Sequence, residues 1–177
     1  FQGKRAFYGD LHVHTHYSLD ASVQGTKTTP EAAYQFAKGE PLRPYGDSEM
    51  QLQLGRPLDF AAVTDHAELL GETEICQNPK RRGHYSFSCL LFRHWPSIGF
   101  IWMNMAVSRG PVFGKVPRLL MCGLNGQRCR EAAKKPWQQI VSAAETANEP
   151  GKFTAFIAYE WTGSPNAKNI HRNVIFN

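Results

Sequence analysis

The sequence has no hydrophobic run long enough to cross a membrane. Its longest apolar stretch, residues 98–107, is about half as long as a membrane-spanning helix must be. Arg93, His94 and Pro96 separate this stretch from the apolar residues 90–92. We therefore predict that the chain has no membrane span.

The chain also lacks a strong excess of either charge. Lys and Arg number 20 against 15 Asp and Glu, which gives a net charge of +5. The clearest basic run, residues 80–84, has neither interleaved aromatic residues nor a nucleic-acid-binding motif, so we interpret it as a solvated loop. We expect a small anionic substrate as partner rather than nucleic acid, and the sequence carries no signal of an oligomeric state.

No two cysteines form a CxxC pair, which argues against a structural zinc ribbon. All four lie in a segment rich in Gly, Pro and Arg, which we interpret as an irregular insertion near residues 72–130. They are Cys76, Cys89, Cys122 and Cys129. They are either free thiols or form up to two disulfides in one of three connectivities. Disulfides would favour a periplasmic or secreted location over a cytoplasmic one.

The length of 177 residues and the hydrophobic content of 42% are typical of one folded domain. Residues 1–3 resemble the remnant of a cleavable tag, and we assign residues 4–177 to the N-terminal portion of a single domain. Only four strands can be counted, and the last ends with the chain. We therefore expect the natural protein to continue beyond Asn177.

The predicted strands are short runs rich in aromatic and β-branched residues, at 6–14, 58–66, 152–162 and 169–176. Thr29 as cap and Pro30 at the first position predict a helix over residues 32–38. Further helices are predicted from Pro136 to about Asn148, and over 89–95 and 98–108 with a break at Pro96. Alternation of strands and helices favours parallel β-α-β units.

The first strand presents two imidazoles on one face. Asp10, His12 and His14 alternate along it, so their side chains point the same way. Neutral imidazole binds zinc, manganese or iron well. A lone histidine is usually an ordinary hydrogen-bonding residue, but this pair, followed by Asp20, favours a metal site.

The second strand ends with Asp65 and His66, at the carboxyl end where parallel α/β folds build their sites. In a regular strand only one of the two side chains faces inward. We assign His66 as a metal ligand and Asp65 as a catalytic-site carboxylate that orients an imidazole. Asp65 could instead cap the following helix.

The third and fourth strands add three candidates. Glu160 is the single acid in an apolar run, and a buried carboxylate needs a metal or an ionic partner. We predict that Glu160 bridges two cations; an ion pair with Lys or Arg is the alternative. His171 lies on the fourth strand beside Arg172, whose planar fork suits a substrate phosphate or carboxylate or an acidic side chain.

In this order, these motifs resemble the PHP (polymerase and histidinol phosphatase) superfamily, and in particular its uncharacterised bacterial PHP-like branch. Residues 9–21, 34–40, 57–68 and 171–176 are similar to its signatures, whereas the cysteine-bearing middle is not. The resemblance implies an α/β fold, a partial distorted (β/α)7 barrel of PHP type, with two or three divalent ions (Zn, Mn or Fe) at its strand ends.

The resemblance also implies a role for each ligand. His12 and His14 match first-metal ligands, Glu160 matches the bridging carboxylate and His171 matches a second-metal ligand. Asp20 and His66 match a third-metal pair, with Asp20 standing where many relatives have His. This change favours ions that prefer oxygen ligands.

From these residues we expect a divalent-metal-dependent hydrolase of a small anionic ester, with a phosphoester the best fit. The alternative from another class is a non-catalytic metal-binding barrel that binds a ligand or a partner. A structural site fills its coordination with protein atoms, whereas a catalytic site keeps a position for water. A nuclease is a weaker third hypothesis, resting only on the modest positive charge.

Overall fold

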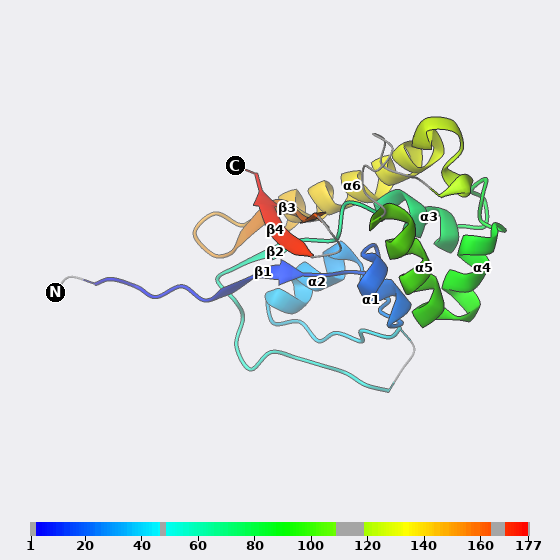
Figure 1. Ribbon diagram of the computed structural model, residues 1–177. Helices are drawn as coiled ribbons and strands as arrows, with labels where there is room; N and C mark the ends of the chain where they lie inside the picture. The colour runs from blue at the N-terminus through cyan, green and yellow to red at the C-terminus, as the bar shows by residue number, and fades with distance from the viewer. Residues whose placement is uncertain (1–2, 47–48, 109–118, 164–168, 177) are drawn as a thin grey trace.

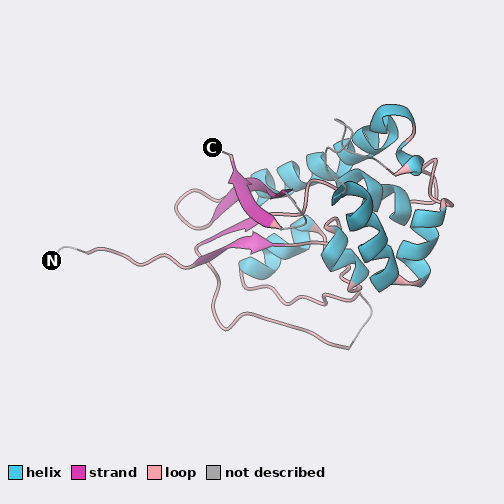
Figure 2. Cartoon of the chain, in the orientation of Figure 1, coloured by secondary structure: helices cyan, strands magenta, loops and turns pink. Residues whose placement is uncertain are grey.

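The computed structural model describes residues 3–46, 49–108, 119–163 and 169–176. Two residues of the predicted tag remnant, 1 and 2, lie outside the described residues. In Figures 1 and 2 a small sheet occupies one end of the molecule, and most of the helical residues gather at the other.

The sheet has four strands in chain order: β1 (Gly9–Val13), β2 (Phe60–Val63), β3 (Thr154–Gly163) and β4 (Ile170–Ile175). The pairs β1–β2 and β2–β3 are parallel, as the alternation of strands and helices predicted. The pair β3–β4 is antiparallel. Only residues 164–169 connect these two strands, and this is too short for the crossover that a parallel pair requires.

The predicted partial (β/α)7 barrel of PHP type is wrong. The described residues form one four-stranded mixed sheet with six α-helices, and no barrel. A barrel of that kind repeats the parallel β-α-β unit, whereas here the repetition stops at β3 and β4 returns as a hairpin.

The first three helices are α1 (Leu19–Val23), α2 (Pro30–Ala37) and α3 (Leu70–Gln77). Helix α2 begins as predicted: Pro30 is its first residue, and the Thr29 hydroxyl accepts a hydrogen bond from the Ala32 amide at 3.2 Å. Gly39, just beyond the helix, has a positive φ of 97° that suits glycine.

In its described residues, 72–108 and 119–130, the predicted irregular insertion is largely helical; residues 109–118 lie outside the described part of the chain. It holds most of α3, then α4 (Phe87–His94), α5 (Pro96–Ser108) and the short 3-10 helices η1 (Leu120–Cys122) and η2 (Leu124–Gly126). The break at Pro96 is confirmed. Helix packing and two disulfides, described below, hold these described residues together despite the Gly and Pro content of the segment.

Helix α6 (Gln127–Ala147) begins nine residues before Pro136, where the sequence predicted its start. A proline inside a helix costs about 3 kcal/mol. The cost is offset because one side of the helix is buried along its length, Pro136 included: Cys129, Ala132, Pro136, Ile140, Ala143, Ala144 and Ala147. Tertiary packing therefore overrides the local signal.

Helices α2 and α6 cover one face of the sheet. Ala61, Val63 and Ile157 on the strands pack in one cluster with Tyr34 of α2 and Ile140 of α6. By alternation the even-numbered residues of β2 and β3 point to the other face. The functional candidates of the sequence lie mainly on that second face.

On β1 the register with β2 shifts between Asp10 and Val13, and Asp10 pairs with Ala61. Asp10 therefore lies on the face that α2 and α6 cover. The predicted common face of Asp10, His12 and His14 does not hold for Asp10.

The sheet is strongly curled. The side-chain amide Nδ2 of Asn173, on the edge strand β4, donates a hydrogen bond of 2.7 Å to the Leu11 carbonyl on β1, the opposite edge. The curl brings side chains from the outer strands over the middle of the second face.

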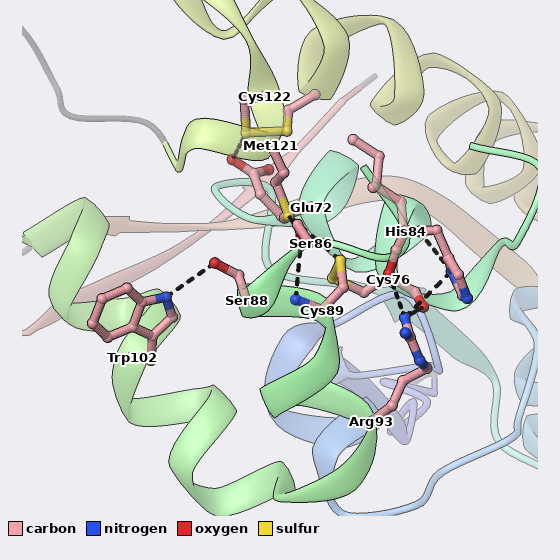
Figure 3. The surroundings of a disulfide bond; sticks show 12 residues. Glu72, Cys76, His84, Ser86, Ser88, Cys89, Arg93, Trp102, Met121 and Cys122 are labelled. Carbon is pink, nitrogen blue, oxygen red and sulfur yellow. Dashed lines mark hydrogen bonds between the residues drawn. A yellow bond between two sulfur atoms is a disulfide. The ribbon is translucent and has the colours of Figure 1, made fainter. Parts of the chain in front are cut away.

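A second core joins α3, α4, η1 and α6 at the end away from the sheet. Disulfides Cys76–Cys89 and Cys122–Cys129 tie α3 to α4 and η1 to α6, and Figure 3 shows their surroundings. This settles which pairing the four cysteines adopt.

No helix in the described ranges combines the length and the apolar character needed to cross a bilayer, in agreement with the sequence prediction.

Candidate metal centre

The carboxyl ends of β1, β2 and β3 bring four of the six predicted ligands together, and α1 and β4 add Asp20 and His171. The backbone of His66, just after β2, pairs with that of Glu160 on β3 as an isolated parallel β-bridge, so the two residues lie side by side across the sheet. His12 belongs to β1 and His14 follows it directly, while His171 pairs with Thr162 on the neighbouring strand. Parallel strands end at the same edge of a sheet, which is why residues so distant in sequence meet here.

Glu160 lies at the centre of the cluster and is 1% exposed. Its Oε2 is 3.0 Å from His12 Nε2, 2.8 Å from His14 Nε2 and 3.7 Å from His66 Nε2. Its Oε1 lies 2.6 Å from His171 Nδ1. Its recorded ionic partners in the described chain are all imidazoles, so the predicted alternative of a Lys or Arg partner is not observed there.

Asp20 contacts the other side of the His14 ring. Its Oδ2 is 2.8 Å from His14 Nδ1 and 3.9 Å from His66 Nε2. The Ser18 hydroxyl donates to Asp20 Oδ1 at 2.6 Å and accepts from the His66 amide at 3.2 Å. Asp20 is therefore closely bonded to His14 and only distantly to His66.

Thr162 joins the remaining two imidazoles. Its hydroxyl is 2.9 Å from His66 Nδ1 and 3.1 Å from His171 Nδ1. Glu68 Oε2 also lies 3.8 Å from His66 Nδ1. These contacts leave His66 Nε2 facing Glu160.

The charges of the cluster are strongly coupled. Burial acts to raise the pKa of Glu160, but the imidazoles of His66, His14 and His12 hold it below its usual value. Burial acts to lower the pKa of His14, yet Asp20 and Glu160 raise it. Burial lowers the pKa of His66, which favours the neutral ring that metal binding requires.

Three groups of side chains have ligand atoms within 4.8 Å of one another: His12, His14 and Glu160; His14, Asp20 and His66; and His66, Glu160 and His171. A fourth group, Glu72 with Cys122 and Cys129, offers no thiolate because its cysteines are disulfide-bonded.

In the described part of the chain the Asp65 carboxylate is bonded to Thr15 and not to an imidazole. It accepts from the Thr15 amide at 2.5 Å and from the Thr15 hydroxyl at 2.7 Å. Burial raises the pKa of Asp65 to about 6. It does not cap α3, whose N-cap is Leu69. Asp65 therefore anchors the chain just after His14 to the end of β2.

The structure does not bring Arg172 to the cluster. Arg172 is adjacent to His171 in β4 and pairs with Trp161, so its side chain points to the face opposite Glu160. Its guanidinium donates to the His171 carbonyl at 2.8 Å. Asp10, in turn, accepts from the His12 amide at 2.8 Å rather than from an imidazole.

Ser18 and Thr162 were missed from the sequence. Thr162 lies two residues after Glu160 on the same strand, so strand alternation alone could have placed it on the face of the cluster. Ser18 precedes α1, and no pattern in the sequence linked it to His66.

The cluster is open to solvent on two sides. The His12 and His171 side chains are 55% and 44% exposed, whereas Glu160 is buried beneath them. A cavity of about 390 Å³ lies beside His12 and His14 at the β1 edge; the rest of its lining comes largely from α2 and the covered face of the sheet, Tyr34, Ala61 and Val63 among them, and does not include Glu160 or His66. Small-molecule sites commonly have this size and lining.

A model of the family described as "Protein of unknown function (DUF3604)" matches residues 2–177. The chain belongs to this family. No curated protein and no solved structure matches the chain.

Membership of the DUF3604 family corrects the predicted membership of the PHP superfamily, because no PHP family model matches. The motifs behind that prediction are short, and they consist of residue types that unrelated metal sites also use. The site must therefore be argued from its own geometry.

Proposed function

We propose that the cluster binds two divalent metal ions and that the chain hydrolyses a small anionic ester, with a phosphoester the best fit. The observation that carries the proposal is the position of Glu160. Its two carboxylate oxygens face different imidazoles, Oε2 toward His12 and His14 and Oε1 toward His171, while His66 lies farther off, 3.7 Å from Oε2. A carboxylate that bridges two ions requires this division.

One ion would be held by His12, His14 and Glu160, and the other by Glu160, His66 and His171. Both sets agree with the observed groupings. Asp20 fits better as the acceptor that orients His14 than as a ligand of a third ion, since it binds the ring nitrogen opposite the one that faces Glu160. Thr162 would orient His66 in the same way.

The donor set suits these ions. Imidazole and carboxylate ligands favour Zn, Mn and Fe. Each proposed ion has three protein ligands, and the exposure of His12 and His171 leaves room for water or substrate. A metal-binding module without catalysis would be expected to fill these positions with protein atoms.

When bound, two adjacent divalent ions lower the pKa of water and neutralise the charge of a phosphoryl group. The chain's own residues fix where this happens. Glu160 sets the spacing of the two positions, while Asp20 and Thr162 hold the orientation of two imidazoles. Asp65 and Thr15 fix the backbone beside His14.

Hydrolysis of p-nitrophenyl phosphate and of a diester analogue, with Mn²⁺ or Zn²⁺ added, tests the proposal. We expect turnover that falls at least about a hundredfold in His14→Ala. The matched control is His94→Ala, because His94 is exposed and lies on α4 away from the cluster; it should keep full activity. Metal binding without turnover on monoesters, diesters and carboxylic esters would overturn the hydrolase and favour the binding module.

A further inference from the structure

Helix α5 turns an apolar stripe toward solvent. Its exposed residues recur with helical spacing on one side: Ile98, Ile101, Trp102 and Met105. The opposite side faces the molecule through Gly99 and Met103, which are buried. A surface helix of a globular protein normally has the reverse pattern, with its apolar side toward the core.

Helix α4 and η1 extend this surface. Phe87 on α4 is 63% exposed, and its ring lies edge-on to that of Trp102 with centroids 5.8 Å apart. Leu120 on η1 is 97% exposed, and its neighbour Met121 lies 3.4 Å from the Ser86 hydroxyl at the start of α4. We call these exposed side chains the apolar face: Phe87, Ile98, Ile101, Trp102, Met105 and Leu120.

The apolar face lies in a cationic part of the chain. Residues 77–130 contain nine Lys and Arg and no Asp or Glu, which leaves 11 Lys and Arg against all 15 Asp and Glu in the rest of the chain.

A cavity of about 450 Å³ in the same part of the molecule is lined by Arg81, Arg82 and Arg128, with a single acid, Glu131, among its lining residues. Arg81 is paired with Glu74 of α3 at 3.1 Å, which leaves Arg82 and Arg128 as the candidate anion-binding groups of this cavity. Leu124, 91% exposed, also lines it.

The arginine cavity borders the apolar face. Gly83 follows Arg82 directly, and a side chain at Gly83 would lie 3.3 Å from Met121, the neighbour of Leu120. Anion-binding side chains and exposed apolar side chains therefore meet at η1. This combination matches an anionic phospholipid surface, which presents phosphate groups above acyl chains.

We propose that this part of the chain docks on the surface of an anionic phospholipid bilayer. The apolar face enters the interface, and the arginines bind lipid phosphates. A second copy of the chain is a poorer occupant, because it would bring two cationic segments together. Nucleic acid would satisfy the arginines but offers little to Ile98, Ile101 and Leu120. The association is peripheral, and it is independent of the proposed hydrolase activity.

Vesicle flotation of the 177-residue chain tests the proposal. We expect the chain to float with vesicles of phosphatidylcholine containing about 25% phosphatidylglycerol, and to float much less with pure phosphatidylcholine. Salt at about 0.5 M should weaken the binding, and brominated lipids should quench part of the tryptophan fluorescence, a part that Trp102→Phe removes. Equal recovery with both kinds of vesicle, or none with either, would overturn the proposal.

Single variants separate the contribution of apolar insertion from that of phosphate binding. Ile101→Asp should lower the partition coefficient at least about tenfold, and Arg82→Gln should lower it only on anionic vesicles. Phe7→Asp and Lys152→Gln are the matched controls, since both residues are exposed and lie outside this surface; they should bind like the parent chain. Circular dichroism checks that each variant is folded.

Two other results would also contradict the proposal. One is a concentration-dependent dimer that Ile101→Asp dissociates, because this would assign the face to a second copy of the chain. The other is duplex DNA binding that Arg82→Gln abolishes while vesicles bind no protein.

Discussion

At the residue scale, the burial of Glu160 is the strongest argument for a metal site. A carboxylate that is 1% exposed must be neutralised, because an unpaired buried charge is costly. Four imidazoles surround it, and without metal they can neutralise it only by holding protons. With divalent ions they can remain neutral and act as ligands. The second arrangement also accounts for the orienting contacts that Asp20 and Thr162 make with the imidazoles.

Loss of an orienting residue should lower metal affinity less than loss of a ligand. Asp20→Asn should weaken Zn²⁺ or Mn²⁺ binding by about ten- to a hundredfold, since an orienting partner is weakened while His14 remains a ligand. Titration calorimetry measures the effect. Asp59→Asn is the matched control, because Asp59 bonds Arg5 and the Tyr8 amide at the other end of the sheet. A loss as complete as that of His14→Ala would contradict the orienting role and make Asp20 a ligand.

At the element scale, the close packing of α3 against α6 requires a glycine, Gly71, where the two helices meet. A Cβ on Gly71 would lie 1.9 Å from the Cys129 carbonyl oxygen, so the two backbones touch directly. No rotamer change relieves this clash, because both groups belong to helical backbone. The helical end of the molecule therefore depends on glycine at this one position.

Gly71→Ala should lower the free energy of unfolding by about 3 kcal/mol, as overpacking at a close helix contact does. Urea denaturation followed by circular dichroism checks this. Gly55→Ala serves as the control, because a Cβ there meets nothing within 4 Å, and its effect should stay within about 0.5 kcal/mol. Equal midpoints for the two variants would contradict the close packing of α3 on α6.

The disulfides stabilise the same elements. The pairs Cys76–Cys89 and Cys122–Cys129 are separated by 13 and 7 residues, and chain entropy predicts about 3 and 2.5 kcal/mol for them. Replacing each pair by alanine should lower stability by about these amounts. Metal binding should persist, since the cluster lies on the sheet. Loss of metal in either double variant would show that the two regions are coupled.

This dependence on disulfides is the reason we propose an oxidising compartment, periplasmic or extracellular, for the chain. All four cysteines are paired.

Local signals predicted the elements well and their arrangement less well. Thr29 and Pro30 marked the start of α2, and Pro96 marked the break between α4 and α5. Pro136 gave a wrong start for α6, because the burial of one side of this helix outweighs the cost of a proline inside it. The antiparallel direction of β4 follows from the length of its connection, a signal that was present in the sequence and went unused.

At the scale of the whole molecule, the candidate site was more predictable than the fold. Strand alternation and strand-end position selected five of the six side chains of the cluster, whereas Asp20 of α1 was chosen because it follows the histidine pair and from the family resemblance. Only the structure showed that Arg172 faces the other way. The fold depended on how many β-α-β units follow one another, and short motifs carry no information about that number. Membership of the DUF3604 family replaces the predicted resemblance to the PHP superfamily.

The two ends of the molecule have separate roles in this account. The sheet carries the cluster of imidazoles and carboxylates, and the helical end carries the apolar face and the arginine cavity. A variant at one end should therefore leave the property of the other end unchanged. This independence lets each proposal be tested without the other.

The metal content of the purified chain tests the central claim most directly. Elemental analysis by inductively coupled plasma mass spectrometry, after equilibration with Zn²⁺ or Mn²⁺ and removal of free ions, should find about two ions per chain. Glu160→Gln should retain the fold and lose most of this metal, while His94→Ala should retain both ions. A parent chain with no bound metal, or a Glu160→Gln chain with the same content as the parent, would contradict the account.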